Sequence, residues 1–124
     1  MTWTYVQLTG ALIRPDGTLL AHGYSGFGDG LNEPGRENIK SIGPLPVGTY
    51  NIGDPYDHPH LGPCVMDLDY VGGPGAFGRS LFRMHGDNAA HAHTASHGCI
   101  IMPPWARYEV ANSDDGVLTV VARP

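Results

Sequence analysis

One cysteine in this 124-residue chain stands in a setting that suits nucleophilic chemistry. Cys99 directly follows Ser96, His97 and Gly98, and His85 lies fourteen residues before it. A cysteine attacks an acyl carbon only as the thiolate, so it needs a base nearby or a lowered pKa. An imidazole can accept the thiol proton and later give it to a leaving amine. The spacing therefore predicts acyl transfer, with Cys99 as nucleophile and His85 as general base and acid.

The residues just before Cys99 are expected to shape a catalytic loop. Gly98 lacks a side chain, so a substrate backbone can approach it, and glycine also permits a strained turn that presents the sulfur. The amides of Gly98 and Cys99 are candidate donors to the oxyanion of a tetrahedral intermediate. Ser96 or a backbone carbonyl could orient the His85 imidazole through its second nitrogen. The plainer alternative is a packed, inert thiol.

The second cysteine and the histidines leave two alternatives open, a disulfide and a metal site. Cys64 lies in an apolar stretch typical of a buried, unreactive thiol, although one disulfide between Cys64 and Cys99 is the other interpretation. A zinc or copper site could use imidazoles with Cys99 as a further ligand. We expect no metal, since loop histidines are more often solvated. The histidines concerned are His58, His60, His85, His91, His93 and His97.

The elements that must position these residues are short strands. The chain has 18 Gly and 11 Pro placed between apolar, β-branched segments, and long helical periodicity is lacking. We expect loops at 26–36 and 71–78 and a short helical turn at 103–107. The fold is predicted to be mainly β, sandwich- or barrel-like with little helix, as a single domain over residues 1–124. The expected strands are Trp3–Leu8, Ala11–Arg14, Thr18–Tyr24, Gly48–Gly53, Cys64–Tyr70, Ser80–His85, Gly98–Met102 and Val117–Ala122.

Charge and hydropathy exclude some partners. The formal net charge is −5 and Lys plus Arg number only 7, so we expect no nucleic acid partner. No apolar run is long enough for a membrane span. The first residues lack the charged region and apolar core of a secretory signal. We therefore expect action at the place of synthesis or export by a signal-independent route.

Two motifs and their spacing resemble a known family. His85-Gly86, followed by the run 96–100 (SHGCI), resembles the signature of L,D-transpeptidases of the YkuD-like fold. The runs 23–26 (GYSG), 43–50 (GPLPVGTY) and 78–82 (GRSLF) are similar to the small-domain branch that includes type VI secretion L,D-transpeptidase effectors. The resemblance extends from about Tyr5 to Val121, and the cysteine element is its most specific part.

The resemblance implies an activity and a set of roles. Cys99 would be the nucleophile, His85 the base and acid, and Ser96, His97 and Gly98 the catalytic loop. The substrate would be the tetrapeptide stem of peptidoglycan, attacked at the carbonyl of the L-centre of diaminopimelate with loss of the terminal D-alanine. Water would complete an L,D-carboxypeptidase reaction, and an amine acceptor a transpeptidase or D-amino-acid exchange reaction. No cofactor is expected.

The sequence departs from the family pattern at one position expected to bind the substrate. Ordinary L,D-transpeptidases carry an arginine two residues after the Cys-hydrophobic pair begins, whereas here Ile100 is followed by Ile101 and Met102. Arg79 or Arg107 could substitute for that cation. The remaining substrate-binding residues implied by the resemblance are Tyr24 and Ser25.

The expected setting is that of an antibacterial effector toxin in the periplasm of a target bacterium, with an immunity protein as partner. A phage-encoded wall enzyme fits the sequence equally. A papain-like peptidase is disfavoured, because its histidine follows its cysteine and no histidine follows Cys99. A phage- or secretion-associated wall-binding module with an inert Cys99 stays open, and its sugar groove could use Trp3, Trp105 or Tyr108.

Overall fold

Short strands dominate the computed structural model, which describes residues 2–88 and 90–124. The helical segments of this part are η1 (Gly28–Gly30), η2 (Pro34–Arg36) and α1 (Pro104–Asn112). The prediction of a mainly β fold with little helix is confirmed. The strands are β1 (Trp3–Val6), β2 (Ala11–Ile13), β3 (Leu19–His22), β4 (Tyr24–Ser25), β5 (Gly48–Ile52), β6 (Tyr56–His58), β7 (Gly62–Gly72), β8 (Phe82–His85), β9 (Ile100–Ile101) and β10 (Val117–Val121).

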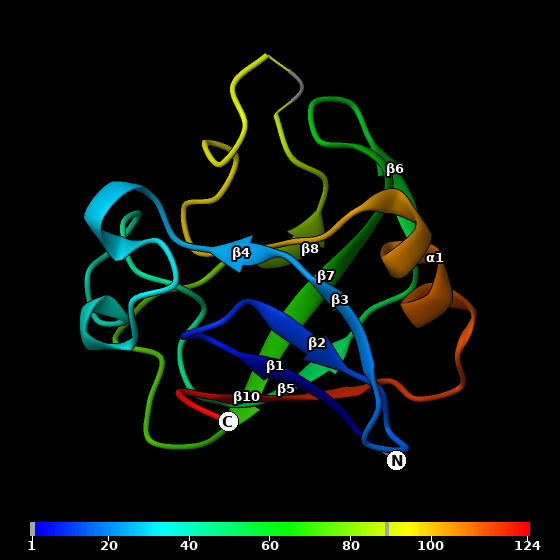
Figure 1. Cartoon of the computed structure of the whole chain (residues 1–124), viewed down its shortest axis with the longest axis horizontal. Coiled ribbons are helices and arrows are strands. Elements are labelled where there is room, and N and C mark those ends of the chain that lie inside the picture. Colours follow the sequence, from blue (N-terminus) through cyan, green and yellow to red (C-terminus); the bar gives the residue numbers. More distant parts are fainter. Residues whose placement is uncertain (1, 89) are drawn as a thin grey trace.

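The main sheet nearly closes on itself. Its strand order is β3-β2-β1-β10-β5-β7-β8-β9-β4, and β6 pairs with β7 beside this path. The two outer strands, β3 and β4, follow one another in the chain across Gly23 (Figure 1). A side chain at Gly23 would strike the carbonyl of Ile101, so glycine is required where β4 meets β9. The barrel-like prediction is thereby confirmed.

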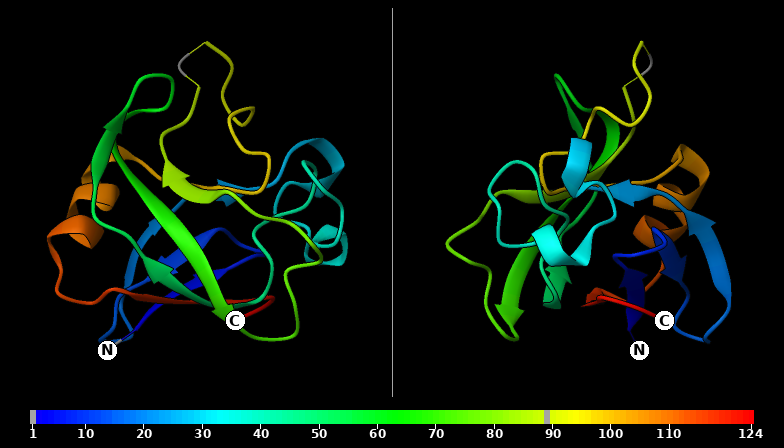
Figure 2. Two further views of the ribbon diagram at one scale, coloured as in Figure 1. Left: turned by 180° about the vertical axis from the view of Figure 1, so that it is seen from behind. Right: turned by 60° about the vertical axis from the view of Figure 1, so that its left-hand side comes forward.

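Two parallel pairings distinguish this sheet from a simple meander. β1 pairs in parallel with β10, which joins the two ends of the chain. β8 pairs in parallel with β9, in a register that sets Met84 opposite Ile100 and His85 opposite Ile101. A parallel neighbour requires a crossover, and residues 86–99 provide it. That crossover and the β6–β7 hairpin project from the same end of the molecule (Figure 2).

The core lies inside the sheet and beneath α1. Alternate residues of the strands point inward, so Trp3, Tyr5 and Leu118 are buried, and Ala106 and Val110 join them from α1. Burying side chains of this size contributes about 2–3 kcal/mol each. The helix packs against β7, the longest strand.

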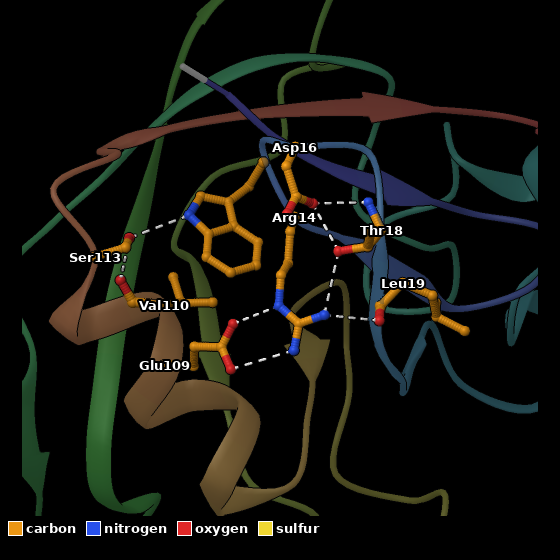
Figure 3. Close-up of polar contacts among 8 residues, drawn as sticks. Arg14, Asp16, Thr18, Leu19, Glu109, Val110 and Ser113 are labelled. Atoms are coloured by element: carbon orange, nitrogen blue, oxygen red, sulfur yellow. Dashed lines mark hydrogen bonds and ion pairs between the residues drawn. The ribbon is translucent and has the colours of Figure 1, made fainter.

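Polar contacts fasten the β2–β3 turn to α1 (Figure 3). Arg14 donates to both carboxylate oxygens of Glu109, at 2.6 and 3.4 Å. The indole N–H of Trp3 donates to the Ser113 hydroxyl at 3.2 Å. The turn itself is fixed by Asp16, which accepts hydrogen bonds from the Thr18 amide and hydroxyl. These contacts tie the N-terminal hairpin to the helix that follows β9.

Some element boundaries differ from the prediction. The strand expected at 18–24 is divided at Gly23, and β6 was not predicted because none of its residues is buried. α1 extends well past the expected turn at 103–107. Its buried residues are Ala106, Arg107 and Val110, and a buried arginine obscures the apolar period. Within the described residues, no helix has the length and apolar character needed to cross a bilayer.

Candidate active site

Cys99 and His85 border the same pocket, which has a volume of about 380 Å³. Cys99 directly precedes β9, and His85 ends β8 opposite Ile101. Because alternate residues of a strand share a face, Cys99 lies on the side of the sheet that His85 occupies. The predicted pair is thus brought together by parallel strands. The full lining is Lys40, Ser41, Leu61, Gly78, Arg79, Ser80, Leu81, Phe82, Arg83, His85, Ala95, His97 and Cys99.

His85 is poised to act as a base. It is buried, and its Nδ1 lies 2.8 Å from the Gly86 carbonyl oxygen. A carbonyl can only accept, so Nδ1 carries the proton and Nε2 is free to take another. Burial lowers the pKa of His85, and the charges of Arg107 and Arg83 lower it further, against the raising effect of the Gly86 hydrogen bond. The imidazole is therefore neutral at pH 7.

Cys99 is a protonated thiol at rest. Burial raises its pKa, although a hydrogen bond from the backbone of Arg83 and the charges of Arg83 and Arg79 act in the opposite direction. A neutral thiol beside a neutral imidazole needs proton transfer before it can attack. This arrangement suits general-base activation and does not rely on a resting thiolate.

Ser96 has a different role from the one considered for it. Its hydroxyl donates to the Cys99 carbonyl at 2.6 Å and accepts from the amides of Gly26 and Gly98. The Gly86 carbonyl, the other candidate, orients His85 instead. The Gly98 amide donates to Ser96 at 3.2 Å, which leaves the Cys99 amide as the candidate oxyanion donor without this contact. Ser96 therefore fixes the shape of the catalytic loop.

Gly98 is required where it stands. Its φ is +123°, a conformation that side-chain-bearing residues rarely adopt. A Cβ at this position would meet the guanidinium of Arg79 at Nη2 and would also approach the ring of Phe82. The loop can turn into Cys99 only because this residue is glycine.

The two arginines proposed for substrate binding are held by backbone carbonyls. Arg79 lines the pocket, but its Nη1 and Nη2 donate to the carbonyls of Glu37, Gly43 and Pro44. Arg107 lies outside the pocket, and its guanidinium donates to the carbonyls of Met102, Cys64 and Pro63. Both guanidinium groups thus bind the backbone, and a role for either arginine in carboxylate binding stays a prediction.

Tyr24 and Ser25 also lie outside the lining of this pocket. The Tyr24 hydroxyl donates to Asp87 and accepts from the Ala95 amide at 3.0 Å, which ties together both ends of the crossover. Asp87 is thus a loop-fixing residue. The Ser25 hydroxyl accepts from the Leu45 amide at 2.8 Å. Both residues position loops, and their assignment to substrate binding stays a prediction.

Several residues of the pocket were not predicted from the sequence. His97 was predicted; it lines the pocket, stacks on Phe27 and donates from Nδ1 to the Ser41 carbonyl at 3.2 Å. Lys40, Ser41 and Arg83 were missed, because only long-range contacts bring them to Cys99. The sequence offers one weak indication of Lys40, which is that Lys and Arg together number only seven.

A second hollow of about 370 Å³ adjoins the first. Leu61, His85 and Ala95 line both, and His60, Gly86, Asp87 and Asn88 complete the second one. His85 therefore borders both hollows.

The sequence left open a disulfide, a metal site and an aromatic sugar groove. Cys64 and Cys99 are both free, and Cys64 is buried, so the two do not form a disulfide. Across residues 2–88 and 90–124, no three His, Cys, Asp or Glu side chains gather as metal ligands would. Trp3 belongs to the core, whereas Trp105 and Tyr108 are exposed on α1.

Comparison with known families identifies the chain. The Tlde1 domain model matches residues 20–123, so the chain belongs to the Tlde1 domain family. This is a type VI secretion effector domain of the peptidoglycan-modifying kind. No curated protein sequence gives a significant match.

Proposed function

We propose that this Tlde1-domain protein is a cysteine acyl-transfer enzyme that acts on the tetrapeptide stems of peptidoglycan. The observation that carries the proposal is the shared pocket of Cys99 and His85, with a neutral imidazole fixed through Nδ1. Membership of a peptidoglycan-modifying effector family supports the choice of substrate.

The first half of the reaction forms a thioester. His85 Nε2 takes the Cys99 proton as the sulfur bonds to the carbonyl carbon at the L-centre of diaminopimelate. The Cys99 amide is the remaining candidate to stabilise the oxyanion, since the Gly98 amide is bound to Ser96. The intermediate collapses, the C–N bond breaks, and His85 returns the proton to the amine of the departing D-alanine.

The second half releases the acyl group. His85 takes a proton from water or from an amine, which attacks the thioester carbon while the C–S bond breaks and the sulfur is reprotonated. Water gives L,D-carboxypeptidase products, and an amine gives transpeptidation or D-amino-acid exchange. The second hollow beside His85 supports a separate route of entry for this reactant.

The wider setting extends the family assignment. We propose that residues 1–124 form one catalytic domain of YkuD-like type, which the pairing of β1 with β10 supports. An effector of this kind would be an antibacterial toxin delivered to the periplasm of a target bacterium, and its producer would need an immunity protein.

Product analysis of purified protein tests the proposal. Disaccharide tetrapeptide is incubated with wild type, Cys99→Ala and Cys64→Ala, and the product masses are read. We expect wild type and Cys64→Ala to release D-alanine and Cys99→Ala to release none. Addition of a D-amino acid separates hydrolysis from exchange. Unchanged substrate in all samples, or equal turnover by Cys99→Ala, would refute the proposed function.

A further inference from the structure

The pocket beside Cys99 carries a charge opposite to that of the protein. The formal net charge of the chain is −5, yet the Lys and Arg residues lining the pocket are Lys40, Arg79 and Arg83. The described residues that line it include no Asp or Glu. Three of the seven Lys and Arg residues thus surround one hollow, which favours an anionic ligand there.

The three cations differ in what already binds them. Arg79 donates to three backbone carbonyls. Arg83 Nε lies 3.3 Å from the Asp67 carboxylate and donates to the Tyr56 hydroxyl at 3.2 Å. Lys40 is exposed, and no hydrogen bond or ion pair from residues 2–88 or 90–124 engages its ammonium group. Of the three, Lys40 is the cation that no hydrogen bond or ion pair within the described residues engages, whereas Arg83 is held through Nε with Nη1 and Nη2 left open.

The segment that carries Lys40 is fixed at the rim of the pocket. Arg79 binds the carbonyls of Glu37 and Gly43, on either side of Lys40 in the chain. His97 donates to the carbonyl of Ser41, so the catalytic loop holds the same segment from the other direction. Ser41 has a φ of +64°, which a non-glycine residue adopts at a cost that the surrounding contacts must offset.

We propose that the Lys40 ammonium binds a carboxylate of the donor peptide and so supplies the cation that is missing after Cys99. This inference rests on the proposed function. The role of Arg79 follows from it: Arg79 positions the Lys40 segment and adds to the positive potential, while Lys40 makes the contact. A tetrapeptide stem offers two carboxylates near the reacting centre, at its C-terminus and on the diaminopimelate side chain.

Binding to an inactive protein tests the contact apart from turnover. In a Cys99→Ala background, the Kd for the disaccharide tetrapeptide is measured by calorimetry with Lys40 intact, Lys40→Gln and Lys40→Arg. We expect about a fivefold rise in Kd for Lys40→Gln, in the range of a partly exposed ion pair, and recovery with Lys40→Arg. Arg36→Gln removes an exposed cation outside the pocket lining and is expected to leave Kd unchanged.

Peptides amidated at one carboxyl or the other identify the bound group. Amidation of the bound carboxylate is expected to weaken binding about fivefold when Lys40 is present and to have little further effect in Lys40→Gln. Equal Kd values for Lys40→Gln and its parent, while wild type releases D-alanine, overturn the Lys40 assignment alone. Absence of both peptide binding and D-alanine release overturns the proposed function itself.

Discussion

Replacement of Gly98 by alanine is expected to damage the catalytic loop in two separable ways. The first is backbone strain, because alanine disfavours a φ of +123°, which costs about 1–3 kcal/mol. The second is a collision between the new Cβ and Nη2 of Arg79. That nitrogen donates to the Gly43 carbonyl at 3.0 Å in a buried setting, and displacing it costs about 1–3 kcal/mol.

The expected total for Gly98→Ala is therefore a loss of about 2–6 kcal/mol in the free energy of unfolding, a large share of a typical domain's stability. Urea denaturation followed by tryptophan fluorescence measures it. Gly62→Ala provides the control for strain alone, since Gly62 has a φ of +87° and open space around it. Gly72→Ala, with open space and no positive φ, is expected to change stability by about 0.5 kcal/mol or less.

The comparison of these variants is decisive for the loop. We expect Gly98→Ala to lose clearly more stability than Gly62→Ala, because only Gly98 adjoins Arg79. Equal losses for the two variants would refute the argument that Arg79 and Gly98 are closely packed. The link between the catalytic loop and the Lys40 segment would then lack its main support.

Three further predictions concern protonation, thiol access and Arg107. Burial lowers the pKa of His85, so its neutral form persists as the pH falls. The acid limb of the pH profile of kcat/KM is therefore expected to have its midpoint below pH 6.5. A midpoint above pH 7 would contradict general-base catalysis by His85. Iodoacetamide at pH 8 is expected to label Cys99 in the native protein. Cys64, which is 3% exposed, is expected to react only after unfolding, as peptide masses will show. Equal labelling rates would show that the two thiols do not differ in access. Arg107→Met is expected to lower the free energy of unfolding by about 3 kcal/mol through unpaired carbonyls, with KM unchanged, whereas a several-fold rise in KM would return Arg107 to the substrate site.

Local sequence patterns were sufficient to predict the fold class and most strands. The strands expected at 80–85 and 117–122 correspond to β8 and β10. The division at Gly23 was not predictable, since it depends on the carbonyl of Ile101, a residue distant in the chain. α1 was underestimated because Arg107 occupies a buried position that apolar periodicity would assign to a hydrophobic residue.

Some features of the candidate site were also predictable from the sequence, and others were not. The proximity of His85 and Cys99 was predicted from their places at the end and start of neighbouring strands, and both border one pocket. The structural contacts of Tyr24, Ser96 and Arg107 were not predicted, because a side chain that binds a distant backbone group leaves no local pattern in the sequence. Lys40 was missed for the same reason: long-range hydrogen bonds from Arg79 bring its loop to the pocket.

The mass of the intact protein during turnover tests the central claim most directly. Wild type is mixed with disaccharide tetrapeptide, quenched in acid within the first turnovers, and analysed before and after proteolysis. The account predicts an adduct equal to the substrate less D-alanine, carried as a thioester on the peptide that contains Cys99, and its absence in Cys99→Ala. Release of D-alanine without any adduct at Cys99, and at an undiminished rate in Cys99→Ala, would contradict it.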